Sequence, residues 1–133
     1  MQAKKHTILP LVGTEQLKLG STRDSVRQEY AELYGGSFQR DNHDIDDYGW
    51  FHAYFVNEVL CAVEFFEPCE VYWGEVQLIG LEFTVCKELF LQNDENLRLE
   101  GNVGFSSLKW QVGVYAPYGT IETVLIAKDD YYH

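Results

Sequence analysis

The chain has 133 residues, of which 46% are hydrophobic and 23% are charged. This length and balance are typical of one folded domain and argue against an intrinsically disordered chain. The formal net charge of −11 disfavours binding to nucleic acid or to an anionic membrane, because both attract proteins of the opposite sign. We therefore expect a single globular domain over residues 1–133.

The excess negative charge is concentrated in one part of the chain. Residues 41–100 carry fourteen acidic and two basic residues, a net charge of −12, whereas the rest carries seven acidic and eight basic residues. No lysine or arginine occurs between Arg40 and Lys87. This polarisation favours a basic protein partner or divalent cations.

The N-terminal stretch and the cysteines are typical of a cytoplasmic protein. The first apolar run is broken by Pro10 and lacks a small-residue cleavage site, so we expect no signal peptide. No apolar run approaches the roughly 18 residues of a membrane span. Cys61, Cys69 and Cys86 form no C-x-x-C pair and are odd in number, which predicts buried, reduced thiols.

The first predicted element is a helix over residues 22–34. Ser21 and Asp24 match a capping box, and a glycine pair closes the C-terminal end. An apolar stripe at helical spacing follows the same segment and consists of Val26, Tyr30 and Leu33.

An acidic segment, DNHDIDDYGWFH at 41–52, is expected to begin as a loop. Strands are predicted at 49–56 and 59–66, joined by a two-residue turn at Asn57 and Glu58. Residues 69–83 are rich in strand formers and predict one or two further strands.

Thr84 is expected to cap a short helix whose residues Val85, Leu89 and Phe90 point inward. Three more strands are predicted at 97–101, 108–117 and 120–128. The expected fold class is therefore α+β, with an antiparallel sheet of about six to seven strands packed with one longer N-terminal helix and one short helix.

The acidic segment does not match a metal or catalytic motif. Aligned as a calcium loop from Asp44, it has Tyr48 in place of an oxygen ligand and Phe55 where the bidentate acid belongs. Its two histidines lack the closely spaced partners of a zinc site. The chain also lacks a nucleophile elbow, a phosphate-binding loop and a dinucleotide fingerprint. We therefore expect no metal, no cofactor and no catalytic residue.

Aromatic side chains follow the acidic segment with strand periodicity. Trp50, His52 and Tyr54 share one face of the predicted strand, next to the aspartates. An exposed aromatic row with a charged rim is typical of a recognition surface. A sheet covered on both faces explains the same pattern equally well.

Two segments resemble known inhibitor families. LGSTRDSVRQEY, residues 19–30, is similar to the turn-then-helix opening of small α+β inhibitor and adaptor domains of the beta-lactamase-inhibitor-like type. The stretch GWFHAYFVNEVLCAVEFFEPCEVYWGEVQLIGLEF, residues 49–83, resembles the hairpin and EFF-x-P pattern of bacterial immunity proteins. Those proteins are encoded beside secreted polymorphic or contact-dependent growth inhibition toxins. The resemblance covers residues 15–85, and its motifs are structural.

The resemblance implies a cytoplasmic immunity protein that blocks a cognate toxin by occlusion rather than chemistry. Such toxins are often nucleases with basic substrate-binding surfaces, which an acidic inhibitor complements. The predicted toxin-binding residues are Asp41, Asp44, Asp46, Asp47, Tyr48, Trp50 and His52.

Two alternatives remain open from the sequence. One is a small cytoplasmic enzyme or ligand-binding domain with a pocket lined by Trp50, Tyr54, Trp73 and Glu64. The other is a homodimer that buries the aromatic face.

Overall fold

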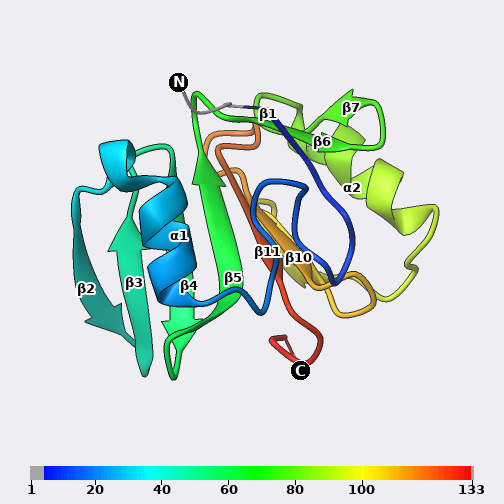
Figure 1. Ribbon diagram of the computed structural model, residues 1–133. Helices are drawn as coiled ribbons and strands as arrows, with labels where there is room; N and C mark the ends of the chain where they lie inside the picture. The colour runs from blue at the N-terminus through cyan, green and yellow to red at the C-terminus, as the bar shows by residue number, and fades with distance from the viewer. Residues whose placement is uncertain (1–4, 133) are drawn as a thin grey trace.

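The computed structural model describes residues 5–132, which form an eight-stranded and a three-stranded sheet with two short α-helices (Figure 1). The helices are α1 Arg23–Glu29 and α2 Phe83–Leu91, and a 3₁₀ helix spans Ala31–Leu33. The strands are β1 Lys5–Thr7, β2 Gly36–Arg40, β3 His43–Asp47, β4 Phe51–Val56, β5 Val59–Phe66, β6 Glu70–Trp73, β7 Val76–Gln77, β8 Arg98–Glu100, β9 Gly104–Ser107, β10 Val112–Tyr115 and β11 Thr123–Ala127.

The fold is mostly β, so the prediction of an α+β fold with six to seven strands and a longer N-terminal helix is wrong. Eleven strands occur within residues 5–132, and the first helix ends at Glu29. At Tyr30 the backbone leaves the α-helical region, with φ −115° and ψ 28°, and its ring enters the core. Leu33 lies in the following 3₁₀ helix and packs against the core. The apolar residues Val26, Tyr30 and Leu33 therefore extend past the end of the α-helix.

The first helix also begins one residue later than the predicted capping box implies. The N-cap is Thr22, whose hydroxyl accepts a hydrogen bond from the Ser25 backbone N–H at 3.2 Å. Ser21 instead donates its hydroxyl to the Lys18 carbonyl at 2.6 Å. A hydroxyl of the expected type therefore caps the helix at the neighbouring position.

The large sheet has the strand order β2-β3-β4-β5-β11-β10-β9-β8, and all of its neighbours are antiparallel. The small sheet has the order β1-β6-β7, with β1 parallel to β6. Two tight turns, Asp41-Asn42 and Asn57-Glu58, close the β2–β3 and β4–β5 hairpins. Their four φ angles lie between 50° and 68°, the left-handed conformation that a two-residue hairpin turn requires.

One face of the large sheet carries the main core. Both helices pack on it through buried side chains, among them Val26 from α1 and Phe90 from α2. Figure 1 shows α1 and the segment that leads to it in front of this sheet. Phe51, Phe55 and Phe65 lie beneath them, each at most 1% exposed.

The opposite face of the large sheet, here called the open face, is covered only in part. Ile45, Tyr54, Cys61 and Ala62 form a smaller buried cluster there, against which Tyr131 packs. Both helices lie on the other side, and Phe38, Glu100 and Tyr115 of the open face are exposed to solvent.

The predictions for the later elements had mixed outcomes. The hairpin at 49–66 and its turn at Asn57 are confirmed, with β5 matching its predicted bounds. The short second helix is also confirmed, but it begins at Phe83, and Val85 is 51% exposed rather than inward. Gly104–Ser107 was missed as a strand because Phe105 is its one large apolar residue, so the segment shows no alternation of apolar and polar residues.

The predicted burial of the three cysteines is confirmed, and all three are free thiols. In residues 5–132, neither helix has the length and apolarity that crossing a membrane requires.

Candidate functional site

The structure separates the seven predicted partner-binding residues into four locations. Two are buried under α1, two lie at the hairpin end of the sheet, two are on the open face, and one packs against the main core. The pair under α1 is Asp46 and Tyr48, and the pair at the hairpin end is Asp41 and Asp44. Asp47 and His52 lie on the open face, and Trp50 packs against the main core.

Asp46 is buried in an ion-pair cluster with two arginines of α1. Its side chain has no exposed surface, and Arg23 Nη2 donates to its Oδ1 at 2.7 Å. Arg27 adds two bonds, from Nε to Oδ2 at 2.9 Å and from Nη2 to Oδ1 at 3.0 Å. Burial alone raises the pKa of this carboxyl, but the hydrogen bonds from Arg27 and Arg23 outweigh it, so the pKa lies below the usual range.

Tyr48 also contacts the Asp46 carboxylate. Its hydroxyl donates to Asp46 Oδ2 at 3.3 Å, and its ring stacks on Phe51 with centroids 5.0 Å apart. Burial raises the pKa of this hydroxyl well above its ordinary value. Asp46 and Tyr48 therefore attach α1 to the sheet and offer no surface to a partner.

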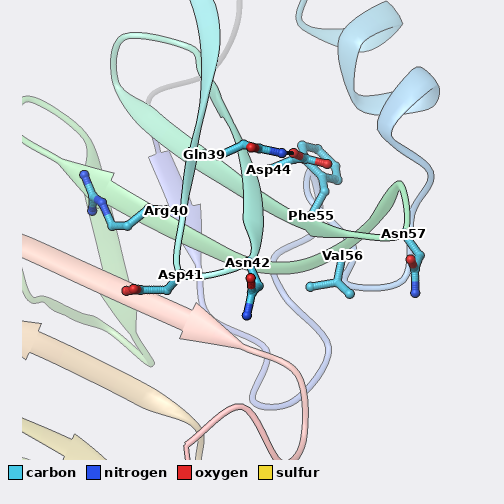
Figure 2. A pocket seen from close by; sticks show the side chains of 8 residues that line it. All are labelled: Gln39, Arg40, Asp41, Asn42, Asp44, Phe55, Val56 and Asn57. Carbon is cyan, nitrogen blue, oxygen red and sulfur yellow. Dashed lines mark hydrogen bonds between the residues drawn. The ribbon is translucent and has the colours of Figure 1, made fainter.

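Asp41 and Asp44 lie beside a surface pocket of about 380 Å³ between the β2–β3 and β4–β5 turns (Figure 2). Gln39 Nε2 donates to Asp44 Oδ1 at 2.8 Å, and Arg23 approaches the other oxygen to 3.6 Å. The pocket is lined by Gln39, Arg40, Asp41, Asn42, Asp44, Phe55, Val56 and Asn57. Arg23 is shared among Asp44, Asp46 and Glu58, so it offsets the charge of Asp44 only in part.

On the open face, the strand registers align a row of side chains across the sheet. Asp47 pairs with His52, His52 with Glu64, and Glu64 with Leu125. His52 Nε2 lies 3.4 Å from Asp47 Oδ1, and His52 Nδ1 lies 4.0 Å from Glu64 Oε1. Within residues 5–132, that buried Nδ1 has no hydrogen-bond partner. Glu64 shares the open face with His52, and its side chain is 21% exposed.

Aromatic rings flank this row. Phe38 and Phe66 meet His52 edge-on, with ring centroids 5.6 and 4.7 Å away. The Tyr54 hydroxyl donates to Glu64 Oε1 at 2.8 Å, which holds that carboxylate in place.

A second row runs parallel to the first and extends the surface toward β8. Phe66 pairs with Thr123, Thr123 with Tyr115, Tyr115 with Gly104 and Gly104 with Glu100. Tyr115 is 49% exposed. A pocket of about 130 Å³ is lined by Glu64 of the first row, by Tyr115 and Glu100 of the second, and by Tyr132 from the segment after β11.

We call His52, Glu64, Phe66, Tyr115 and Glu100 the open-face patch. It combines three aromatic rings with two carboxylates on a surface that neither helix covers. The bases Arg40 and Arg98 lie on the two edge strands, and Arg98 shares β8 with Glu100 of the patch. Of its three rings, Tyr115 is exposed, whereas His52 and Phe66 are half-buried. Aromatic anchors among polar groups are the composition of a docking surface.

The four residues of the alternative ligand pocket lie on opposite faces of the large sheet. Trp50 and Trp73 pack against the main core, and the Trp73 ring lies 4.6 Å from Phe90. Tyr54 and Glu64 meet on the open face. Across residues 5–132, no group of three His, Cys, Asp or Glu side chains is placed to hold a metal ion.

Comparisons of the chain with protein-family models, with curated proteins and with solved structures give no match.

Sequence reasoning missed three members of the open-face patch, Phe66, Tyr115 and Glu100. They belong to strands that are distant in sequence and become neighbours only through the β5–β11–β10–β9–β8 pairing. The available signal was Glu64, the one charged residue in the apolar run 59–66. Because side chains alternate along a strand, Phe66 lies on the same face as Glu64 and its partner His52.

Proposed function

We propose that this protein is an inhibitor of the immunity type, which binds a cognate toxin domain, a basic nuclease, and blocks it in the cytoplasm. The observation that carries the proposal is the open-face patch, where aromatic rings and carboxylates share a sheet face that neither helix covers. Occlusion needs such a surface and needs no catalytic group.

Charge supports the same partner chemistry. The chain's net charge of −11 complements a surface that binds a nucleic-acid backbone. Long-range attraction would speed association, and burial of Phe66 and Tyr115 would slow dissociation. Because Asp46 is already neutralised by Arg23 and Arg27, we assign the contact to the open-face patch rather than to the aspartates as a group.

The test is a calorimetric titration with a catalytically inactive toxin domain encoded beside the gene, at low and at moderate salt. We expect tight binding that weakens as salt rises. Truncating a central aromatic anchor costs about 2 kcal/mol, so Tyr115→Ala should weaken binding about thirtyfold.

Val85→Ala is the matched control, because Val85 is 51% exposed on α2, which packs on the other face of the sheet. Its binding should equal that of the unmodified protein. Absence of binding would overturn the proposal, and equal losses in both variants would overturn the assignment of the surface. Growth rescue of toxin-expressing bacteria provides the functional readout.

A further inference from the structure

Strand β2 is an exposed edge of the eight-stranded sheet (Figure 1). It lies at the far left of the view, with β3 on one side and no other strand of residues 5–132 on the other. Its last four residues are all exposed. Edge strands are commonly protected by proline, lysine or a bulge, yet β2 reads GSFQR and pairs with β3 in five consecutive registers without a shift.

We propose that β2 pairs antiparallel with β2 of a second copy of this chain, about a two-fold axis through Phe38. This symmetry places Phe38 opposite Phe38 and Arg40 of each copy opposite Gly36 of the other. The two large sheets join edge to edge. The inference does not rest on the proposed inhibition of a toxin.

Charge complementarity identifies the second copy as the occupant of this edge. Gly36 lies in register with Asp47, whose side chain is 44% exposed. A Cβ placed on Gly36 would have no atom within 4 Å, so no side chain fills the space beside Gly36. In the pair, Arg40 of one copy lies two strand spacings, about 10 Å, from Asp47 of the other. An extended arginine side chain passes over Gly36 through this open space and meets the carboxylate.

The same contact cannot form within one copy. Arg40 pairs with His43 at the turn of the β2–β3 hairpin, whereas Asp47 pairs with Gly36 at its far end. Arg40 instead lies over the Phe38 ring, 5.4 Å from its centroid, which holds it on the open face. The two-fold axis generates the contact between Arg40 and Asp47 twice.

Apolar burial at the axis adds to these ion pairs. The Phe38 ring is 37% exposed and meets its equivalent in the second copy, beside the His52 ring of each. Because the axis is perpendicular to the joined sheet, the open-face patches of both copies lie on the same side. The other edge strand, β8, has only three residues and offers a shorter seam.

Sedimentation equilibrium over a wide concentration range tests the pairing with charge-reversed variants. The unmodified chain should show a reversible dimer. Arg40→Glu and Asp47→Lys should each raise the dimer dissociation constant about tenfold or more, because each places like charges at both contacts. An equimolar mixture of the two variants should restore the dimer, since every contact then joins Glu to Lys or Arg to Asp.

Arg98→Glu on β8 is the matched control and should leave the mass unchanged. Asp47→Lys also removes the acceptor of the Gly49 N–H, at 2.8 Å, so circular dichroism must confirm its fold. Phe38→Asp supplies a second disruption, because it brings two carboxylates together at the axis.

A chain that stays monomeric at millimolar concentration overturns the proposal. So does a dimer that survives Arg40→Glu and Phe38→Asp, or one that only Arg98→Glu disrupts. Toxin binding is read in a separate titration, so failure of the dimer and failure of the proposed inhibition are distinguishable.

Discussion

Arg23 Nη2 and Asp46 Oδ1 lie 2.7 Å apart beneath α1, where none of the aspartate side chain is exposed. Arg27 binds the same carboxylate from the next turn of the helix. One of the most acidic stretches of the chain is therefore partly structural, because its central aspartate fixes α1 to the sheet.

Replacing Asp46 with asparagine should destabilise the fold by about 3 kcal/mol, because it leaves two arginines facing a buried neutral group. Urea unfolding measures this loss as a shift in midpoint at constant slope. Asp44→Asn is the control, since its carboxylate is 34% exposed and 3.6 Å from Arg23, and should cost less than about 1 kcal/mol. Equal losses in the two variants would contradict a stabilising role for the ion pairs of Asp46 with Arg23 and Arg27.

The same carboxylate should make stability depend on pH. Its pKa in the folded protein lies below that of the unfolded chain, ordinarily about 3.9. The ion pairs therefore contribute their full stability above the unfolded pKa, and this contribution is lost as pH falls through the folded pKa. The unfolding free energies of the unmodified protein and Asp46→Asn should differ by a constant amount above about pH 5 and converge in stronger acid. A difference that persists unchanged in strong acid would contradict the assignment.

Gly113 should be intolerant of any side chain because Tyr132 lies directly over it. A Cβ at Gly113 would clash with the Tyr132 hydroxyl oxygen. The segment is held by Gln111, whose Oε1 accepts from the Tyr132 N–H at 2.6 Å and whose Nε2 donates to the Tyr132 carbonyl at 3.1 Å. We expect Gly113→Ala to displace the Tyr132 ring from the open face.

Ultraviolet titration of the tyrosines provides the measurement. Burial raises the pKa of Tyr132 in the folded protein, so displacement should return one tyrosine toward its ordinary pKa of about 10. Tyr132→Phe identifies which transition belongs to this residue. The idea fails if the alkaline transitions of Gly113→Ala match those of the unmodified protein.

The buried thiols should react slowly in the folded protein. Burial raises the pKa of Cys61, and it raises that of Cys86 to about 12, so little thiolate forms near neutral pH. Alkylation with iodoacetamide should leave Cys86 unmodified until urea unfolds the chain, as mass spectrometry of digested protein would show. Rapid modification under native conditions would mean that α2 opens readily, since Cys86 lies on its buried face.

Local sequence signals were sufficient for elements whose interactions are close in the chain. The β4–β5 hairpin was predictable because β-branched and aromatic residues flank a two-residue turn that lacks apolar side chains. The start of α1 was predictable to one residue because hydroxyl side chains near Thr22 cap a helix N-terminus. The buried, reduced thiols followed from the odd number of cysteines and the lack of a C-x-x-C pair.

The β2–β3 hairpin was missed because its burial pattern conflicts with its polarity. Asp46 faces the core side of β3, where strand periodicity calls for an apolar residue. Its partners Arg23 and Arg27 lie 23 and 19 residues earlier, so only the packing of α1 on the sheet satisfies its charge.

By itself, the sequence determined the local hairpin, the position of the first helix cap and the net charge, because these depend on neighbouring residues or on composition alone. The tertiary structure decided which acids are neutralised and which reach the solvent. It also assembled the open-face patch from β4, β5, β10 and β8, whose side chains meet only when the whole sheet forms. Cross-strand pairing joins residues far apart in sequence, and no local pattern encodes that pairing.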